Sequence, residues 1–263
     1  MAKFMLSRRR FLTAATIAGS GLALSGCDVF DALGDRDSTV RSVIESANDL
    51  TYKAQRLVLG REALAREYPK SEIRQPQRPN GSTDPDDPYY RSLVASNFAD
   101  YRFEIGGLVE KPLSFSLDEL RNMPSRTQIT RHDCVEGWSC IAEWTGVQLS
   151  RLLDQAKVKP EARYVVFKCL DTIEESASGG IKYYESIDMI DARHPQTIMA
   201  YGLNGKPLPV ANGAPLRCRV ERQLGYKMAK YVKSIELTDS LAQFGQGHGG
   251  YWEDNGYDWY AGI

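Results

Sequence analysis

The residues best suited to carry chemistry surround Cys134. The segment from Arg131 to Cys140 reads Arg-His-Asp-Cys-Val-Glu-Gly-Trp-Ser-Cys, so charged residues, glycine and tryptophan flank this cysteine. A cysteine of a hydrophobic core usually lies among aliphatic residues instead. A thiolate is a soft metal ligand, and the neighbouring Arg131 would favour the deprotonated form of the thiol. The segment therefore indicates a metal-ligating cysteine at position 134.

Other motifs lie on both sides of this cysteine and indicate the elements that position it. Alternating residues from 101 to 105 predict a strand, and Ser116 followed by Glu119 predicts a capping box that opens a short helix. Residues 164–168, 215–220 and 231–237 predict three more strands. Short strands and helices alternate without an internal repeat, which favours one α+β domain with a mixed sheet.

The motifs, in this order, resemble a family. Five segments resemble the sulfite oxidase-type molybdopterin-binding domain. They are Gly106 to Leu113, the cysteine segment with Trp144-Thr-Gly, Asn204 to Pro209, Asn212 to Arg217, and Gly225 to Lys230. The resemblance runs from Asn97 to Leu237, more than half of the chain. Within the fold, it is nearest to the bacterial periplasmic methionine sulfoxide reductase catalytic subunit branch. It implies a molybdenum–molybdopterin cofactor and an oxygen-atom transfer reaction.

The resemblance also implies which residues form the site. Cys134 would ligate molybdenum, with Arg131 beside it. An arginine fork and a lysine charge suit the phosphate of the pterin, and an amide can pair with the pterin edge. Small side chains or backbone groups complete the set of cofactor-binding residues. In this set, Cys169 stands where the family has a small polar residue. The implied cofactor-binding residues are Asn97, Phe98, Cys134, Cys169, Asn212, Arg217, Met228, Ala229 and Lys230.

Differences from the sulfite oxidases indicate whether the enzyme oxidises or reduces its substrate. Val135 to Trp138 after the cysteine suits a neutral substrate beside an aromatic wall, and Asn212 stands where many sulfite oxidases carry histidine. We therefore expect a reductase of sulfoxides such as methionine sulfoxide. Ala99-Asp100 and Arg222 to Leu224 depart from the reductase pattern, which leaves the substrate open. Two alternatives remain: a sulfite-oxidising enzyme that passes electrons to a cytochrome, and a catalytically inactive, lipid-anchored binding module.

The N-terminus predicts export. Three arginines, Arg8 to Arg10, precede a short apolar run, as in a twin-arginine signal, and Leu24 to Cys27 resembles a lipobox. We expect residues 1–26 to be the signal and Cys27 to be a lipid anchor. The expected location is the periplasm or the outer face of the cytoplasmic membrane.

The remaining predictions concern domain organisation and partners. Residues 27–90 predict a helical extension and a polar linker, and 91–263 predict the molybdopterin domain, without a C-terminal dimerisation domain. The predicted signal carries four of the 33 basic residues and no acidic one, so the rest of the chain is mildly acidic and no basic stripe suggests nucleic acid. No flavin, haem or iron–sulfur motif occurs. We therefore expect its electrons to come from a membrane haem protein or a c-type cytochrome. Separately, we expect the chain to be a monomer.

Overall fold

The computed structural model describes residues 39–58, 60–176 and 179–263. The predicted signal and Cys27 lie outside the described residues. None of the described helices is long and apolar enough to cross a membrane. The chain divides into two compact units, residues 1–54 and residues 55–263. The second unit contains the predicted domain together with residues 55–90, so the polar segment before residue 91 packs with the domain.

The first sheet is mixed, as predicted from the sequence. Among the described residues it has five strands in the order β2-β1-β10-β5-β6, with β1 and β10 parallel and the other pairs antiparallel. Gly107 ends β1 with φ +79°, and a Cβ there would lie 2.2 Å from the carbonyl oxygen of Leu237, so only glycine fits. The strands are β1 (Arg102–Gly107), β2 (Leu113–Ser116), β5 (Tyr164–Ser176), β6 (Gly179–Asp188) and β10 (Val232–Thr238).

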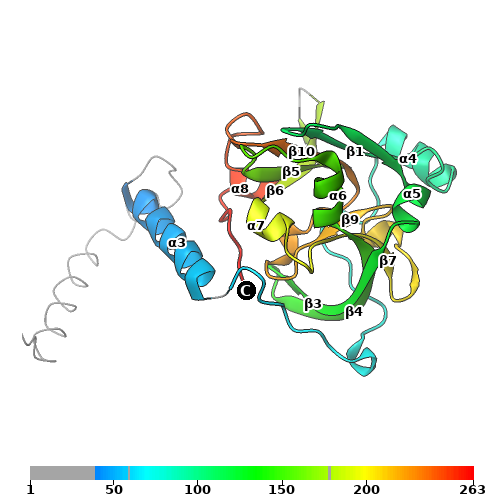
Figure 1. The fold of residues 1–263 in the computed structure, drawn as a ribbon, viewed down its shortest axis with the longest axis horizontal. Helices are drawn as coiled ribbons and strands as arrows, with labels where there is room; N and C mark the ends of the chain where they lie inside the picture. The colour runs from blue at the N-terminus through cyan, green and yellow to red at the C-terminus, as the bar shows by residue number, and fades with distance from the viewer. Residues whose placement is uncertain (1–38, 59, 177–178) are drawn as a thin grey trace, which may run out of the picture. The chain divides into compact units, whose positions relative to one another are not determined.

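The second sheet carries the cysteine segment. Its described strands run in the order β3-β4-β7-β8, and β9 pairs with β7. In Figure 1 the strands β3 and β4 lie below β1, β5 and β10 of the first sheet. Antiparallel pairing of β3 with β4 brings Cys134 opposite Trp138 across a tight turn. The strands are β3 (Ser125–Cys134), β4 (Trp138–Gln148), β7 (Ile198–Leu203), β8 (Lys206–Pro207) and β9 (Arg217–Arg219).

The helices are short apart from α3, which lies within the range of the predicted helical extension. The predicted capping box is present: the Ser116 side chain accepts from the Glu119 backbone, and the Glu119 carboxylate accepts from the Ser116 backbone. The helices are α3 (Thr39–Val58), η1 (Lys70–Glu72), α4 (Pro88–Ala95), α5 (Leu117–Arg121), α6 (Leu149–Ala156), α7 (Met189–Ala192), η2 (Val210–Asn212), η3 (Gly225–Lys227) and α8 (Tyr251–Asp254).

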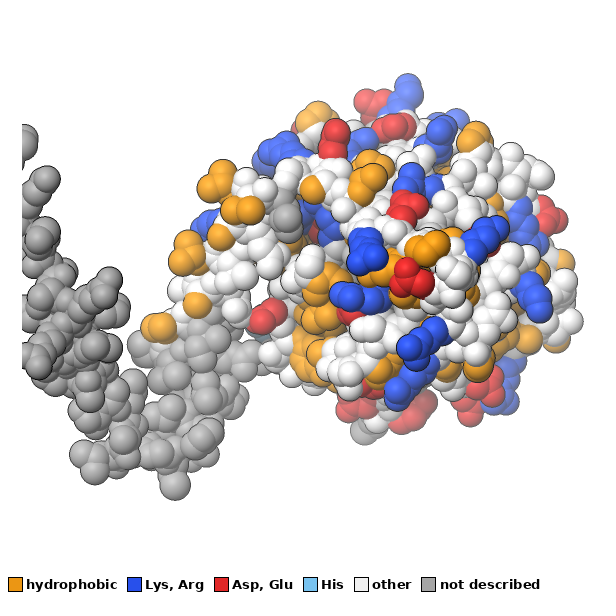
Figure 2. Space-filling view, turned by 90° about the horizontal axis from the view of Figure 1, so that it is seen from below, with side chains coloured by type: hydrophobic (Ala, Val, Ile, Leu, Met, Phe, Trp, Pro, Cys, Tyr) orange, Lys and Arg blue, Asp and Glu red, His pale blue; other side chains and the backbone are white. Residues whose placement is uncertain are grey.

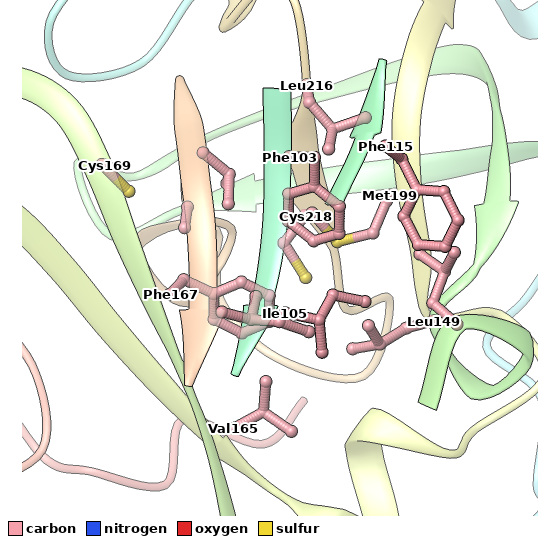
Figure 3. Close-up of a cluster of buried hydrophobic side chains, with 14 of the residues drawn as sticks. Phe103, Ile105, Phe115, Leu149, Val165, Phe167, Cys169, Met199, Leu216 and Cys218 are labelled. Carbon is pink, nitrogen blue, oxygen red and sulfur yellow. The ribbon is translucent and has the colours of Figure 1, made fainter. Parts of the chain in front are cut away.

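The main hydrophobic core takes side chains from both sheets and from α6. Figure 3 shows Phe103 and Ile105 of β1 beside Val165 and Phe167 of β5, with Met199 of β7 on the other side. All five are at most 2% exposed. Burial of this apolar area is the main force that holds the two sheets together. It fixes the sheet ends from which the functional side chains project.

Figure 2 shows one face of the molecule, on which Lys and Arg side chains alternate with acidic and hydrophobic ones. Several large hydrophobic residues are exposed on the second unit, and Val135, next to Cys134, is one of them at 46%. An apolar residue that is exposed beside a candidate catalytic group is suited to contact a substrate.

Candidate cofactor site

A pocket of about 140 Å³ opens beside Cys134. Its wall combines segments that are far apart in the sequence. The lining residues are Asn80, Gly81, Ser82, Cys134, Val135, Glu136, Asp171, Ile173, Tyr183, Gly225, Tyr226, Met228, Lys230, Trp252 and Tyr257. The pocket thus joins the cysteine segment, the Gly225–Lys230 motif, the β5–β6 pair and the C-terminal tail.

Cys134 is a half-buried free thiol at the end of β3. Gly137, with φ +83°, makes the turn that brings Trp138 back opposite it. Burial raises the pKa of the Cys134 thiol, and the charge of Glu136 raises it further. A hydrogen bond to the Glu136 backbone and the charge of Arg78 act in the opposite direction. A metal would supply the missing positive charge and favour the thiolate.

Arg131 does not face this thiol. Alternate residues of a strand point to opposite sides, so Arg131 shares a face with Asp133 and not with Cys134. Its guanidinium Nε lies 2.8 Å from Asp133 Oδ1, and its side chain is half exposed. Arg78, not Arg131, is the arginine whose charge lowers the Cys134 pKa. The expectation for Arg131 treated residues close in sequence as close in space, which a strand does not permit.

Trp138 connects Arg78 to the cysteine turn. The Arg78 guanidinium lies over the Trp138 ring at 4.6 Å from its centroid, and the indole Nε1 donates a 2.9 Å hydrogen bond to Glu136. The ring therefore has a fixed place between a cation and a carboxylate. This arrangement fixes the turn that carries Cys134, although Trp138 itself does not line the pocket.

Arg217 is a deeply buried cation at the inner end of the site. It lies on β9, is 1% exposed, and its guanidinium lies 4.9 Å from the Trp144 ring centroid. One of its amino groups donates to the Asn212 carbonyl at 2.9 Å, while its Nε has no hydrogen-bond partner among the described residues. Burial and the charge of Arg219 lower its pKa to about 9. A bound anion would therefore stabilise the charged form of this buried arginine.

Lys230 is the second buried cation, and its pKa is lowered to about 7 by burial and by the nearby charge of Arg217. Its Nζ donates to three carbonyl oxygens, those of Asn80 (2.7 Å), Ala211 (2.8 Å) and Ser82. None of the described carboxylates forms an ion pair with Lys230 or Arg217. Two buried cations without a paired carboxylate fit the phosphate of molybdopterin.

Asn212 and Gly213 complete this inner end. Asn212 is 5% exposed, and its Nδ2 has no hydrogen-bond partner among the described residues. Gly213 has φ +109°, and a Cβ there would lie 2.9 Å from the Lys230 side chain. The chain therefore needs glycine here to bring Asn212, Lys230 and Arg217 together. An unpaired amide beside two cations suits a heterocycle that carries a phosphate.

The structure brings some of the other predicted contacts to the site and not others. Met228 lines the pocket, whereas Ala229 and Cys169 belong to the hydrophobic core. Asn97 and Phe98 form a turn with φ of 49° and 62°, and neither lines the pocket. Phe98 instead packs against buried hydrophobic residues of both core clusters.

Several residues that line the pocket were not predicted from the sequence. Asp171 lies two residues after Cys169 on β5, so the strand period could have indicated it. Trp252 and Tyr257 lie in the C-terminal tail, beyond the range from Asn97 to Leu237 that the family resemblance covers. No local signal marks residues 80–82, because their place depends on contacts with residues about 150 positions later.

A buried charge cluster lies behind the wall of the pocket. Lys227 Nζ donates to Glu185 at 2.5 Å and also to Glu253, and all three side chains are at most 1% exposed. Burial and the charge of Glu253 raise the pKa of Glu185. The Tyr183 hydroxyl donates to the Tyr226 carbonyl at 2.5 Å. The cluster therefore anchors β6, η3 and the C-terminal tail, which together form this wall.

Comparison with known families agrees with this geometry. Residues 91–244 match the model of the oxidoreductase molybdopterin binding domain, and this range contains Cys134, Asn212, Arg217 and Lys230. The chain belongs to this family. It is thus an oxidoreductase with a molybdopterin cofactor, and both the predicted family and the predicted α+β fold are confirmed.

Relatives support the membership over most of the chain. The chain is similar to the putative protein-methionine-sulfoxide reductase subunit YedZ1 of Azospira oryzae, at 36% identity over 97% of this chain and 88% of that protein. It is also similar to the protein-methionine-sulfoxide reductase catalytic subunit MsrP of Xanthomonas axonopodis, at 36% identity over 61% of this chain. The match spans 52% of that relative.

Among solved structures, the sulfane dehydrogenase SoxCD from Paracoccus pantotrophus is similar at 29% identity. The match covers 54% of this chain and 39% of that one, with a TM-score of 0.47.

Proposed function

We propose that this chain is an exported molybdenum enzyme that reduces sulfoxides, with methionine sulfoxide as the foremost substrate. The observation that carries the proposal is that Cys134 and Lys230 line one pocket, and that the buried Arg217, whose charge acts on Lys230, has an Nε atom without a hydrogen-bond partner among the described residues. The names of the relatives, which are methionine sulfoxide reductases, support the choice of substrate.

Each group of residues has a role in this proposal. Cys134 supplies a soft thiolate ligand to molybdenum. Arg217 holds the phosphate with its guanidinium, and Lys230 attracts it through its charge, because the three donors of Lys230 are engaged on carbonyl oxygens. Asn212 donates to the pterin. When bound, the cofactor supplies the two-electron chemistry, in which a sulfoxide, two electrons and two protons give a sulfide and water. The protein residues bind, orient and desolvate the reactants.

The wall of the pocket favours a neutral sulfoxide over an anion such as sulfite. Val135 is exposed beside the thiol, and aromatic rings of Tyr183, Trp252 and Tyr257 line the pocket. A sulfur atom makes favourable contacts with aromatic rings. Glu136, which also lines the pocket, would repel an anionic substrate.

The cellular setting is part of the proposal. The arginines before the apolar run and the Leu24–Cys27 motif support twin-arginine export and a lipid anchor. The enzyme would then act in the periplasm or at the outer face of the cytoplasmic membrane. Its electrons would come from a membrane haem protein or a c-type cytochrome, because the sequence carries no motif for a second redox group.

Turnover direction tests the function. The protein, purified from a host that makes molybdopterin, is assayed with free and protein-bound methionine sulfoxide and a reduced dye, and separately with sulfite and an electron acceptor. We expect sulfoxide-dependent oxidation of the dye and no sulfite-dependent reduction of the acceptor. Turnover with sulfite alone would reverse the proposed direction, and a loaded protein inactive with both would leave a binding module.

A further inference from the structure

Asp171 is a buried carboxylate in the wall of the pocket, and one of its two oxygen atoms lacks a hydrogen-bond partner among the described residues. Its side chain is 4% exposed, and its Oδ1 atom has no hydrogen-bond partner among the described residues. Asp171 lies on β5 and lines the same pocket as Cys134 and Lys230. A buried, unsatisfied carboxylate costs free energy, so its presence in a pocket indicates a bound group that satisfies it.

The nearby cations are already engaged. The Nζ atom of Lys230 uses its three donors on carbonyl oxygens. Lys182 donates to Asp87 at 2.7 Å and to the Leu170 carbonyl at 2.6 Å. Both lysines act on Asp171 through their charge, but neither donates a hydrogen bond to it. The protein therefore places positive charge around this carboxylate and leaves its oxygen free.

The position of Asp171 along the pocket indicates which part of the cofactor it would meet. Its electrostatic partners are Lys230 and Lys182. The charges that act on Cys134 are those of Glu136 and Arg78. Asp171 thus interacts electrostatically with Lys230 and is not among the groups whose charge acts on Cys134. The pyran ring of molybdopterin carries both the phosphate and the metal-binding sulfur atoms, and a phosphate repels a carboxylate. The N–H donors that a carboxylate can meet lie on the pterin.

We propose that Asp171 binds the heterocycle of molybdopterin, with its carboxylate accepting hydrogen bonds from the N–H groups of the pterin. The pyrimidine ring of a pterin presents an amino group next to a ring N–H, and a carboxylate can accept from two neighbouring donors at once. The assignment rests on the cofactor site described above and adds a residue that recognises the organic part of the cofactor.

The ionisation of Asp171 gives the assignment a signature. Burial raises the pKa of this carboxyl to about 6. Donors of the pterin favour the charged form, so binding releases a proton when the free carboxyl is protonated. The titratable groups that face or influence Asp171 are Lys230, Lys182, Tyr90, Tyr183, Tyr231 and Cys169.

The test compares the full chain with Asp171→Asn, and uses Asp118→Asn as the matched control. Asp118 is 86% exposed on α5 and pairs only with Arg121 among the described residues. Each protein is made in a host that supplies the cofactor. Molybdenum and pterin per chain are measured before and after dialysis at pH 7.5 and at pH 5, and circular dichroism confirms the fold.

We expect Asp171→Asn to retain about tenfold less pterin than the wild type after dialysis at pH 7.5, and Asp118→Asn to match the wild type. The deficit of Asp171→Asn relative to the wild type shrinks by about tenfold at pH 5, where the wild-type carboxyl is protonated. A comparison of the two proteins at each pH cancels the titration of Lys230, which both share.

Two results would overturn the assignment while leaving the proposed function intact. One is equal pterin retention by the wild type and Asp171→Asn at both pH values. The other is full retention with lost turnover, which would make Asp171 a proton donor to the substrate. A wild-type protein without pterin or molybdenum would instead contradict the proposed function itself.

Discussion

The Nζ atom of Lys230 donates a 2.7 Å hydrogen bond to the backbone carbonyl of Asn80, a residue 150 positions earlier in the chain. The same ammonium donates to Ser82, and the Tyr231 hydroxyl donates to Ser82 at 2.9 Å. A segment before the family domain is therefore held at the phosphate-binding end of the pocket. Asn80, Gly81 and Ser82 form part of the pocket wall as a result.

Lys230→Met tests this double role. Loss of the ammonium removes a phosphate ligand and releases residues 80–82, so we expect at least about tenfold less bound pterin and faster proteolysis between residues 78 and 84. Pterin fluorescence and mass mapping of the cleavage sites give the two readouts. Lys111→Met, at an exposed position away from the pocket, is the control. Unchanged cleavage in Lys230→Met would show that the lysine does not hold the segment.

We expect Asp171→Asn to change how the stability of the cofactor-free chain depends on pH. Burial raises the folded-state pKa of Asp171 from 3.8 to about 6, so the folded state binds more protons between these values. Wild-type stability therefore falls as pH rises from about 4 to 6 through this group. At pH 7 the variant should be more stable by up to about 3 kcal/mol. Urea unfolding of both proteins at pH 4 and pH 7 measures this, and a difference that does not grow with pH would argue against it.

Arg78→Gln tests which arginine acts on the Cys134 thiol. The charge of Arg78 favours the thiolate, so its removal raises the Cys134 pKa and slows alkylation of the cofactor-free chain by iodoacetamide, about two- to fivefold at pH 7.5. Mass spectrometry identifies Cys134, while Cys140, Cys169 and Cys218 are buried. Arg131→Gln is the control, because Arg131 pairs with Asp133. Slower alkylation in Arg131→Gln alone would restore the role expected from the sequence.

Lys227→Met tests the buried charge cluster that supports the pocket wall. Removal of the ammonium leaves Glu185 and Glu253 together without their cation, so we expect a loss of about 3–5 kcal/mol in unfolding free energy. Chemical denaturation at pH 7 measures it. Lys233→Met removes a more exposed ion pair with Glu104 and should cost at most about 1 kcal/mol. Equal losses in the two variants would mean that the cluster does not stabilise the fold.

The sequence predicts what depends on local pattern. Ser116 and Glu119 form a capping box because three residues separate them, and the cysteine turn follows from glycine at 137. The resemblance names both Arg217 and Lys230, and both are buried in the structure. These features need only neighbours in sequence or the resemblance to a family.

Long-range contacts account for what the sequence did not predict. Asn80 reaches Lys230 only because the folded chain brings them together, and nothing in the local pattern near Asn80 indicates it. Asp171 resembles any acidic residue on a strand in the sequence, and only the folded structure shows that it is buried with its Oδ1 atom unpartnered among the described residues. Arg131 is adjacent to the thiol in sequence, yet the strand period turns it to the opposite side.

The most direct test of the account is the molybdenum centre of the wild type, Cys134→Ser and Cys140→Ser, each isolated from a host that makes molybdopterin. Elemental mass spectrometry gives metal per chain, and electron paramagnetic resonance and visible absorption report the ligands. We predict about one molybdenum per chain in the wild type and in Cys140→Ser, and a centre lost or spectroscopically altered in Cys134→Ser. The same metal content and the same spectra in Cys134→Ser as in the wild type would contradict ligation by Cys134.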